Sequence, residues 1–177
     1  MKDGIDYFPL DVQVDDKFDL IEAEFGLTGF AVVVKLFQKI YGGFGYYCEW
    51  TKDVAMLFGK RLGFNPGDNV VSEIVSASIK RGIFDREKYE KYKILTSYGI
   101  QKRYFEAVSR RKNISIKNEY LLVQVDQFFK DVNIFTENVN NSSKNVYISK
   151  QSKVEESKVY TKDNSVFSDI EKLTRGK

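Results

Sequence analysis

The residues with the clearest chemical potential are the cations in Tyr98 to Lys112, "YGIQKRYFEAVSRRK". This stretch has one acid, Glu106, against five bases. At about 100° per residue, a helix here would place Ile100, Tyr104, Ala107 and Val108 on one face and most of the bases opposite. Two interpretations follow: a basic helix that holds nucleic acid, or the solvated back of an ordinary core helix.

These bases belong to a longer basic block. Residues 80–112 contain eleven bases and four acids, a net charge of +7, whereas residues 1–25 contain two bases and eight acids, a net charge of −6. Such segregation says more about partners than the total charge of +3 does. Lysine and arginine side chains contact the phosphate backbone and give salt-sensitive, largely sequence-independent affinity. The candidate DNA-binding residues are therefore Lys80, Arg81, Arg86, Lys88, Lys91, Lys93, Lys102, Arg103, Arg110, Arg111 and Lys112. Of these, Arg111 falls nearer the apolar face, where we expect fraying or snorkelling at the helix end.

The composition argues against most catalytic chemistry. The chain has no histidine, which removes histidine-activated nucleophiles and histidine-ligated metals, and its single cysteine, Cys48, is expected to be a small buried hydrophobe. The glycines of "YGGFG" lack the lysine and serine or threonine of a phosphate-binding loop. We therefore expect no enzyme, no cofactor and no metal. The alternative is a metal-dependent nuclease that uses the acids Asp11, Asp15, Asp16, Asp19 and Glu22, but acids are common beside a helix start.

The elements that must position the basic block read as mostly helical. Asp15 or Asp16 is a candidate N-cap, residues 27–43 form a buried helix, and "FGYYCEW" forms a short strand. Helices are expected over 51–63, capped by Thr51, and over 68–82. The short apolar stretches 82–85 and 93–97 flank "REKYEKY" as a hairpin with a basic tip. This order is that of a winged helix-turn-helix domain of the α+β class.

The outward face of helix 68–82 offers few side chains that read bases. It carries Asn69, Ser72, Glu73, Ser76 and Ser78. We therefore expect weak sequence specificity.

The composition changes toward the C-terminus. Residues 118–129 are expected to add a strand or small helix, and in residues 136–165 Asn, Ser and Lys occupy 16 of 30 positions. Too few apolar residues remain there to offset the ordering of the backbone. We expect a domain at 1–122 and a disordered polar linker or tail at 123–177.

The stretches "YFPLDVQVDDKFDLIEAEFGLTGFAVVVKLFQKIYG", "GYYCEW", "DVAMLFGKRLG", "IVSASIKRGIFD" and "ILTSYGIQKRYFEAVSRRK" together resemble the N-terminal domain of DnaD-like phage replisome organisers. The likeness runs from about Asp6 to Leu122. It implies a winged-helix domain that binds DNA at a replication origin, self-associates, and helps to recruit the replicative helicase or its loader. Fuller members of that family carry a second, helical DnaD-type domain after the linker, which this sequence lacks. Helicase loading is the part of the resemblance that this departure puts in question.

The sequence thus predicts a non-enzymatic DNA-binding and scaffold protein of phage replication initiation, located in the bacterial host cytoplasm. It opens with no signal peptide, and its longest apolar run, Phe30 to Val34, is too short to span a membrane. The alternative is a protein-interaction module, an oligomerising adaptor or inhibitor, whose basic block meets an acidic partner surface. Its interface candidates are the apolar helices 27–43 and 51–63.

Overall fold

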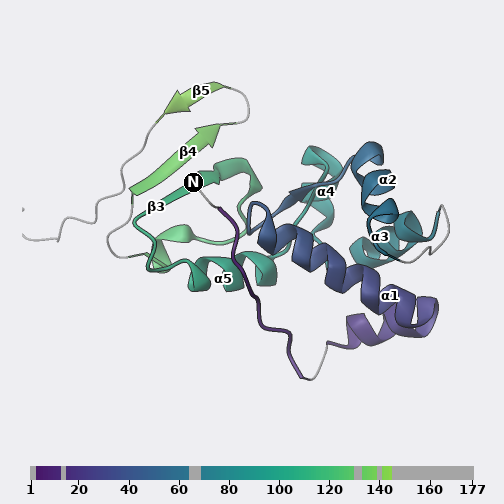
Figure 1. Cartoon of the computed structure of the whole chain (residues 1–177). Coiled ribbons are helices and arrows are strands. Elements are labelled where there is room, and N and C mark those ends of the chain that lie inside the picture. The colour runs from purple at the N-terminus through teal and green to yellow at the C-terminus, as the bar shows by residue number, and fades with distance from the viewer. Residues whose placement is uncertain (1–2, 13–14, 64–68, 130–132, 139–140, 145–177) are drawn as a thin grey trace, which may run out of the picture.

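The computed structural model describes residues 3–12, 15–63, 69–129, 133–138 and 141–144 (Figure 1). Within these ranges the helices are α1 (Asp16–Gly42), α2 (Lys52–Lys60), α3 (Val70–Lys80), α4 (Arg86–Tyr92) and α5 (Tyr98–Ala107). The strands are β1 (Cys48–Glu49), β2 (Ile94–Leu95), β3 (Asn113–Lys117), β4 (Asn133–Asn138) and β5 (Asn141–Lys144). Two short 3-10 helices, η1 (Asn118–Tyr120) and η2 (Val125–Gln127), lie between β3 and β4. The expected α+β, mostly helical class is confirmed.

The long helix α1 begins at the predicted cap. The Asp15 side chain accepts a hydrogen bond from the backbone N–H of Lys17 at 3.3 Å. The helix bends at Gly26, whose φ of +65° lies in the left-handed region that glycine adopts without strain. Gly26 has non-helical φ and ψ and so divides α1 into two helical segments, in agreement with the separate helix predicted over 27–43. Its buried residues include Phe18, Ile21, Val32, Val33, Leu36 and Ile40.

Helices α2 and α3 follow the predicted helix pair. Thr51 caps α2 by accepting a hydrogen bond from the backbone N–H of Val54 at 3.3 Å. In α3 the residues Val71, Ile74 and Val75 are buried, as the spacing of apolar residues predicts, and α3 packs on both α1 and α2. Figure 1 shows these helices together on one side of the molecule.

The predicted basic hairpin is wrong. "REKYEKY" is helix α4, capped by the Asp85 side chain, which accepts a hydrogen bond from the backbone N–H of Lys88 at 2.8 Å. Residues 82–85 form no strand, and β2 pairs instead with β1, antiparallel, with Cys48 opposite Leu95. Arg, Glu and Lys are good helix formers, and a cap at Asp85 outweighs the short apolar runs on either side. The winged helix-turn-helix arrangement as a whole stays a prediction.

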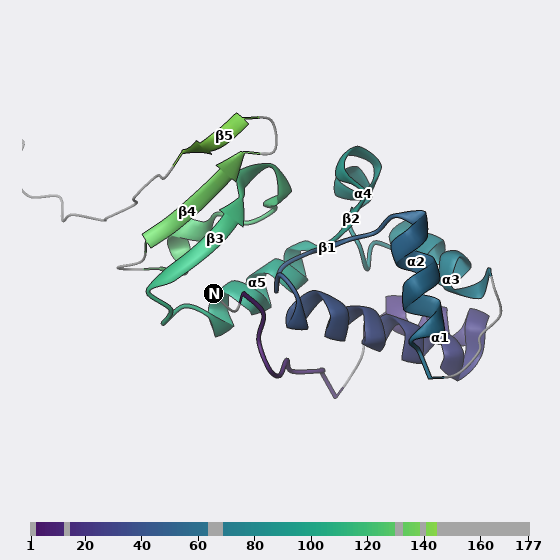
Figure 2. The same ribbon diagram turned by 45° about the horizontal axis from the view of Figure 1, so that its top comes forward.

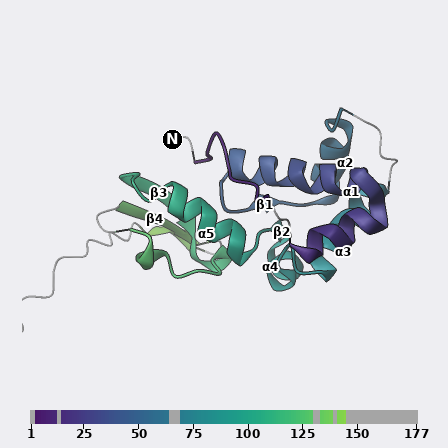
Figure 3. The same cartoon turned by 90° about the horizontal axis from the view of Figure 1, so that it is seen from below.

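The other side of the molecule is built from α5 and a three-stranded sheet (Figures 1 and 3). β3 pairs in parallel with β4, and β4 pairs antiparallel with β5. The core continues beyond the predicted boundary at residue 122, because Val123, Val125, Phe129 and Ile134 are buried in the same cluster as α1 and α5. The division into two domains stays a prediction, and most of the predicted tail, residues 145–177, lies outside the described residues.

A buried polar network joins these two halves at Gln101 of α5. Its side-chain Nε2 donates to Thr96 Oγ1 at 3.0 Å and to the carbonyl of Tyr120 at 2.8 Å, and its Oε1 accepts from the backbone N–H of Leu122 at 2.7 Å. Thr96 in turn donates to the carbonyl of Tyr46 at 2.6 Å. The network fixes η1 and the segment before β1 against α5, since a satisfied buried network allows few alternative arrangements.

Candidate nucleic-acid interface

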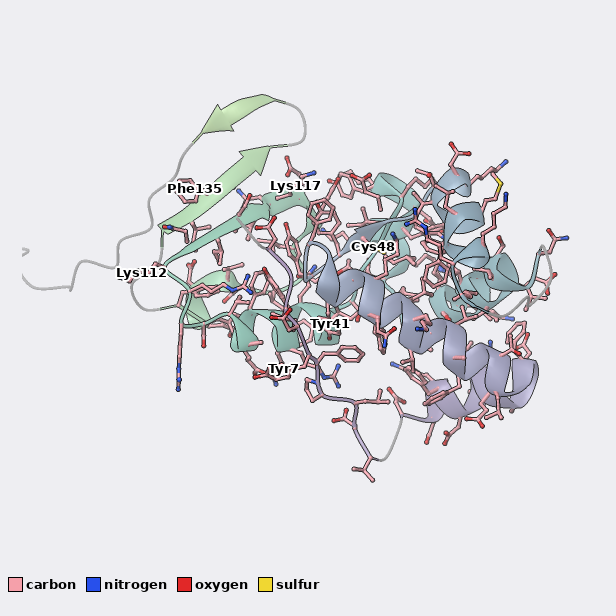
Figure 4. The ribbon with its side chains drawn as sticks, in the orientation of Figure 1. Tyr7, Tyr41, Cys48, Lys112, Lys117 and Phe135 are labelled. Carbon is pink, nitrogen blue, oxygen red and sulfur yellow. The ribbon has the colours of Figure 1, made fainter. Side chains whose placement is uncertain are left out.

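Arg103 of α5 and Arg111, which follows the turn after α5, bind the N-terminal segment, defined here as residues 3–12. Arg103 Nη2 lies 2.9 Å from Asp11 Oδ2. Arg111 donates from Nη1 to the carbonyl of Asp3 at 2.7 Å and from Nη2 to the carbonyl of Gly4 at 2.6 Å. Figure 4 shows this segment passing in front of α5 and the end of α1. Two of the predicted DNA-binding residues therefore have a role within the fold.

Further contacts hold the N-terminal segment in place. Tyr104 donates its hydroxyl hydrogen to the carbonyl of Asp3 at 2.7 Å, and burial raises the pKa of Tyr104 to about 12, with Arg111 opposing and Asp3 adding to that rise. The backbone N–H of Ile5 donates to the carbonyl of Tyr41 at 2.8 Å, and the ring of Phe8 stacks on that of Tyr41 at 4.8 Å. A Cβ at Gly4 would lie 2.5 Å from the carbonyl oxygen of Gly42, so this close approach requires glycine. The acidic start of the chain is thus packed on the basic helix.

Two more of the predicted cations also have protein partners. Arg81, after α3, forms an ion pair with Glu24 of α1. Lys102 lies 4.0 Å from Glu106 one turn along α5, with both side chains about half exposed. Such exposed pairs contribute little free energy, so Lys102 can still reach a ligand.

Helix α4 carries cations of a different kind. Among the residues that the structure describes, none of Arg86, Lys88, Lys91 and Lys93 forms an ion pair. The ammonium groups lie over tyrosine rings instead: Lys93 over Tyr89 at 5.0 Å, Lys91 over Tyr92 at 5.1 Å and Lys88 over Tyr92 at 5.8 Å from the ring centroids. Lys88 also donates to the carbonyl of Glu119 at 2.6 Å, which ties α4 to η1. These contacts do not neutralise the ammonium groups, and residues 85–93 carry four bases against three acids, a net charge of +1.

The remaining predicted cations are exposed at the ends of helices. Lys80 closes α3, and Arg110 and Lys112 follow α5. Lys80 lines a groove between α1 and α3 whose walls are Glu24, Phe25, Asn69, Ser72, Glu73, Ser76, Ala77, Lys80 and Arg81. The groove carries two acids and two bases, so it does not form a positive surface by itself. Figure 2 shows helix α4 close to the α2–α3 pair.

The sequence interpretation did not include Lys117 at the end of β3 (Figure 4). Its ammonium group lies over the rings of Tyr120 at 5.3 Å and Tyr47 at 5.7 Å, on the same side as the α4 lysines, since Tyr120 also contacts Tyr92 at 5.2 Å. Lys117 lies outside the block at 80–112, so charge counting alone could not find it.

Among the described residues, no group of three or more histidine, cysteine, aspartate or glutamate side chains is arranged so that it could hold a metal ion. Cys48 is buried, and burial raises the pKa of its thiol to about 12, which makes a reactive thiolate unfavourable at neutral pH. Of the helices in this part of the chain, none combines the length and the apolar character needed to cross a membrane.

Comparison with known proteins gives a family for this architecture. The family model described as "Lin1244/Lin1753-like, N-terminal" matches residues 7–100. The chain is 40% identical over 185 residues to "Uncharacterized phage-related protein Lin1244/Lin1753" of Listeria innocua serovar 6a, an alignment that covers 98% of this chain and 59% of the relative. The chain therefore spans a little over half the length of that relative. No solved structure matches. The resemblance to DnaD-like proteins stays a prediction.

Proposed function

We propose a function for this chain, which belongs to the Lin1244/Lin1753-like, N-terminal family. In this proposal it is a non-enzymatic phage protein that binds duplex DNA through α4 and the end of α3. The phage assignment follows the description of the relative as phage-related. The observation that carries the DNA assignment is the contrast in partners within the basic block. The cations of α4 have no carboxylate partner in the described chain, whereas Arg81, Arg103 and Arg111 bind protein groups.

The binding mode follows from the side chains available. Lysine and arginine on α4 contact phosphates in this binding mode. The exposed face of α3 offers mainly serine side chains for contacts with bases, and the carboxylate of Glu73 would repel a phosphate. Affinity should therefore depend steeply on salt and little on sequence. Of the eleven predicted residues, the proposal keeps Lys80, Arg86, Lys88, Lys91 and Lys93 as the main DNA contacts. Lys102, Arg110 and Lys112 are secondary contacts, and Arg81, Arg103 and Arg111 are left out.

The finer biological role comes from the resemblance described above. We propose that the chain acts as a scaffold in phage replication initiation in the host cytoplasm, self-associates, and meets the replicative helicase or its loader. The alignment covers 59% of the relative. In this proposal, contacts with a helicase can therefore also involve parts of the relative that this chain does not span.

The direct test is fluorescence anisotropy with a labelled duplex at salt concentrations between about 50 and 200 mM. The expected result is binding that weakens steeply with salt and is reduced in the double variant Arg86→Gln, Lys91→Gln. The matched control is Lys35→Gln, Lys39→Gln, which removes the same charge from α1 and should bind like the parent. No binding at low salt, or equal loss in the two variants, would overturn the DNA assignment.

A second candidate function is a protein-interaction module, which exposed apolar side chains on α2 favour. Met56 is 56% exposed and Leu57 is 52% exposed. An adaptor would self-associate or bind an acidic protein without binding duplex at low salt. Duplex binding at low salt separates this candidate from the first, and sedimentation of the parent and of Met56→Ser, Leu57→Ser shows whether α2 is the surface of self-association.

A further inference from the structure

Four aromatic rings form a continuous row from the loop before β1 to α4. Phe44 stacks on Tyr47 with centroids 4.7 Å apart and planes 3° apart. Tyr47 meets Tyr120 of η1 edge-on at 4.8 Å, and Tyr120 meets Tyr92 of α4 at 5.2 Å. The row joins three segments that are far apart in the sequence, and we call it, with the lysines below, the lysine–tyrosine strip.

Lysines accompany this row along its length. Lys117 lies over Tyr47 and Tyr120, Lys88 and Lys91 lie over Tyr92, and Lys93 lies over Tyr89 on the neighbouring turn of α4. Significant contacts of this kind occur about once per 70–80 residues in proteins. Here five such contacts, all lysine on tyrosine, lie in one region of the described chain. Tyr47 and Tyr120 are buried, so this region presents its lysines and Phe44 to solvent.

Phe44 gives the strip an open ring. One face of Phe44 is stacked on Tyr47, yet the side chain is 45% exposed, so the rest of the ring is open to solvent. The neighbouring Gly45 has a φ of +88°, and a Cβ there would lie 1.9 Å from the ring of Tyr104. Glycine at this position lets the loop pack directly on α5, and the stacking on Tyr47 sets the orientation of the Phe44 ring.

A small cavity lies between this ring and β3. It has a volume of about 130 Å³ and is lined by Asp3, Phe44, Tyr46, Tyr47, Ser115 and Lys117. The backbone N–H of Lys117 donates to the Tyr46 hydroxyl at 2.9 Å, which anchors β3 to the loop. The carboxylate of Asp3 disfavours a phosphate in the cavity, so the cavity suits the edge of a base or sugar, and the lysines outside it suit the phosphates.

We propose that the lysine–tyrosine strip binds single-stranded nucleic acid, with a base stacked on Phe44 and the backbone running over Lys117 toward Lys91 and Lys93. An aromatic ring next to lysines is the combination that single strands recognise, because their bases are free to stack on a side chain and those of a duplex are not. The proposal deepens the proposed function, on which it rests, because Lys91 and Lys93 belong to both surfaces. Phe44 and Lys117 belong only to the strip.

The test compares the parent with Phe44→Ala, Phe44→Leu, Lys117→Gln and Tyr7→Ala. The last is the matched control, because Tyr7 is an aromatic side chain that is 86% exposed and lies well away from Lys117 (Figure 4). Binding is measured by anisotropy for a labelled thymine oligonucleotide, a uracil oligonucleotide of the same length, and a duplex. The two single strands show whether the strip prefers DNA or RNA.

Both Phe44 variants should bind the oligonucleotides about fivefold to a hundredfold more weakly, the range for loss of one stacked base, with unchanged duplex affinity. Lys117→Gln should lower the salt slope by about 0.7, the value for one phosphate of a single strand. Equal oligonucleotide binding by Phe44→Ala and Tyr7→Ala, or no oligonucleotide binding by the parent, would overturn the proposal. If oligonucleotides bind through Phe44 but the duplex does not bind, the strip stands and the duplex function falls.

Phe44→Leu keeps the variant interpretable, because leucine retains apolar packing against Tyr47 without a flat ring. Circular dichroism melting of each variant gives the comparison of folding. A Phe44→Leu protein that melts like the parent and binds oligonucleotide like the parent would also overturn the proposal.

Discussion

Helices α4 and α5 both carry lysine and arginine, three residues of seven in α4 and two of ten in α5, but the fold uses these cations in different ways. The arginines in and just after α5 hold the N-terminal segment, through Asp11 and the carbonyls of Asp3 and Gly4. The lysines of α4 lie over tyrosine rings, and none forms an ion pair in the described part of the chain. A count of bases along the sequence cannot separate these cases. What separates them is the partner. Arg103 and Arg111 bind the N-terminal segment, whereas in α4 Lys88 donates to the carbonyl of Glu119 and Lys91 lies over a tyrosine ring.

This difference explains the charge segregation seen in the sequence. The acidic start of the chain is packed on part of the basic block, where charge-assisted hydrogen bonds are among the stronger polar contacts. The field that a distant polyanion meets is then set by the cations left over, on α4 and at the helix ends. Three predictions test the comparison by changing the α5 side.

The largest effect is expected for Arg111→Gln. The variant loses two charge-assisted hydrogen bonds that hold residues 3 and 4, and its free energy of unfolding should fall by about 2 to 3 kcal/mol. Urea denaturation followed by circular dichroism measures this. The neighbour Arg110 is exposed, so Arg110→Gln is the control and should leave the midpoint unchanged within error. Equal midpoints for the two variants would mean that Arg111 is not an anchor.

A smaller effect is expected for Tyr104→Phe, which loses the hydrogen bond to Asp3, at about 1 kcal/mol. Burial raises the pKa of Tyr104 from its ordinary value of 10.0 to about 12. The neutral phenol is therefore favoured in the folded state, so its contribution is complete below pH 10 and is lost as the pH rises from about 10 through about 12.

Unfolding titrations at pH 8 to 12 check this sign. The parent should lose stability above pH 10, and Tyr104→Phe should lose it less steeply. The remaining slope comes from the other groups whose pKa values burial raises, which are Tyr41, Tyr46, Tyr120 and the thiol of Cys48. Identical slopes in the two proteins would show that Tyr104 does not titrate with unfolding.

The smallest effect is expected for the pair Arg103 and Asp11. The two side chains are 2.9 Å apart, but they are 41% and 65% exposed, so solvent screens the pair. A double-mutant cycle with Arg103→Gln and Asp11→Asn should give a coupling free energy of about 0.5 kcal/mol, which falls with added salt. A coupling above about 2 kcal/mol would indicate a buried pair and contradict the exposed geometry.

Much of the fold could be predicted from local sequence signals. The caps at Asp15 and Thr51 are side-chain hydrogen bonds to nearby backbone groups, and the buried faces of α1 and α3 follow the helical period. The short apolar runs on either side of "REKYEKY" favour a hairpin, but Asp85 is a cap residue followed by helix formers, and the segment folds as α4.

The remaining features depend on contacts between distant residues. β3 pairs in parallel with β4 across residues 118–132, and the aromatic row joins Phe44, Tyr92 and Tyr120 from three elements. Neither leaves a periodic pattern in the sequence. The same holds for the site, because the partners of Arg103 and Arg111 lie about a hundred residues earlier in the chain.

The central claim is that α4 holds DNA and α5 holds the N-terminal segment, and one pair of salt titrations tests it most directly. The α4 variant combines Arg86→Gln and Lys91→Gln with Lys93→Asn just after the helix. Asparagine is chosen at residue 93 because the φ of 53° there is left-handed. The α5 variant combines Lys102→Gln, Arg103→Gln and Arg110→Gln. Each is titrated against one labelled duplex at several salt concentrations. The account predicts that the α4 variant lowers the slope of log affinity against log salt by about 0.9 for each lost phosphate contact, and that the α5 variant lowers it by less than about 0.9 in total. A larger slope change for the α5 variant than for the α4 variant would contradict it.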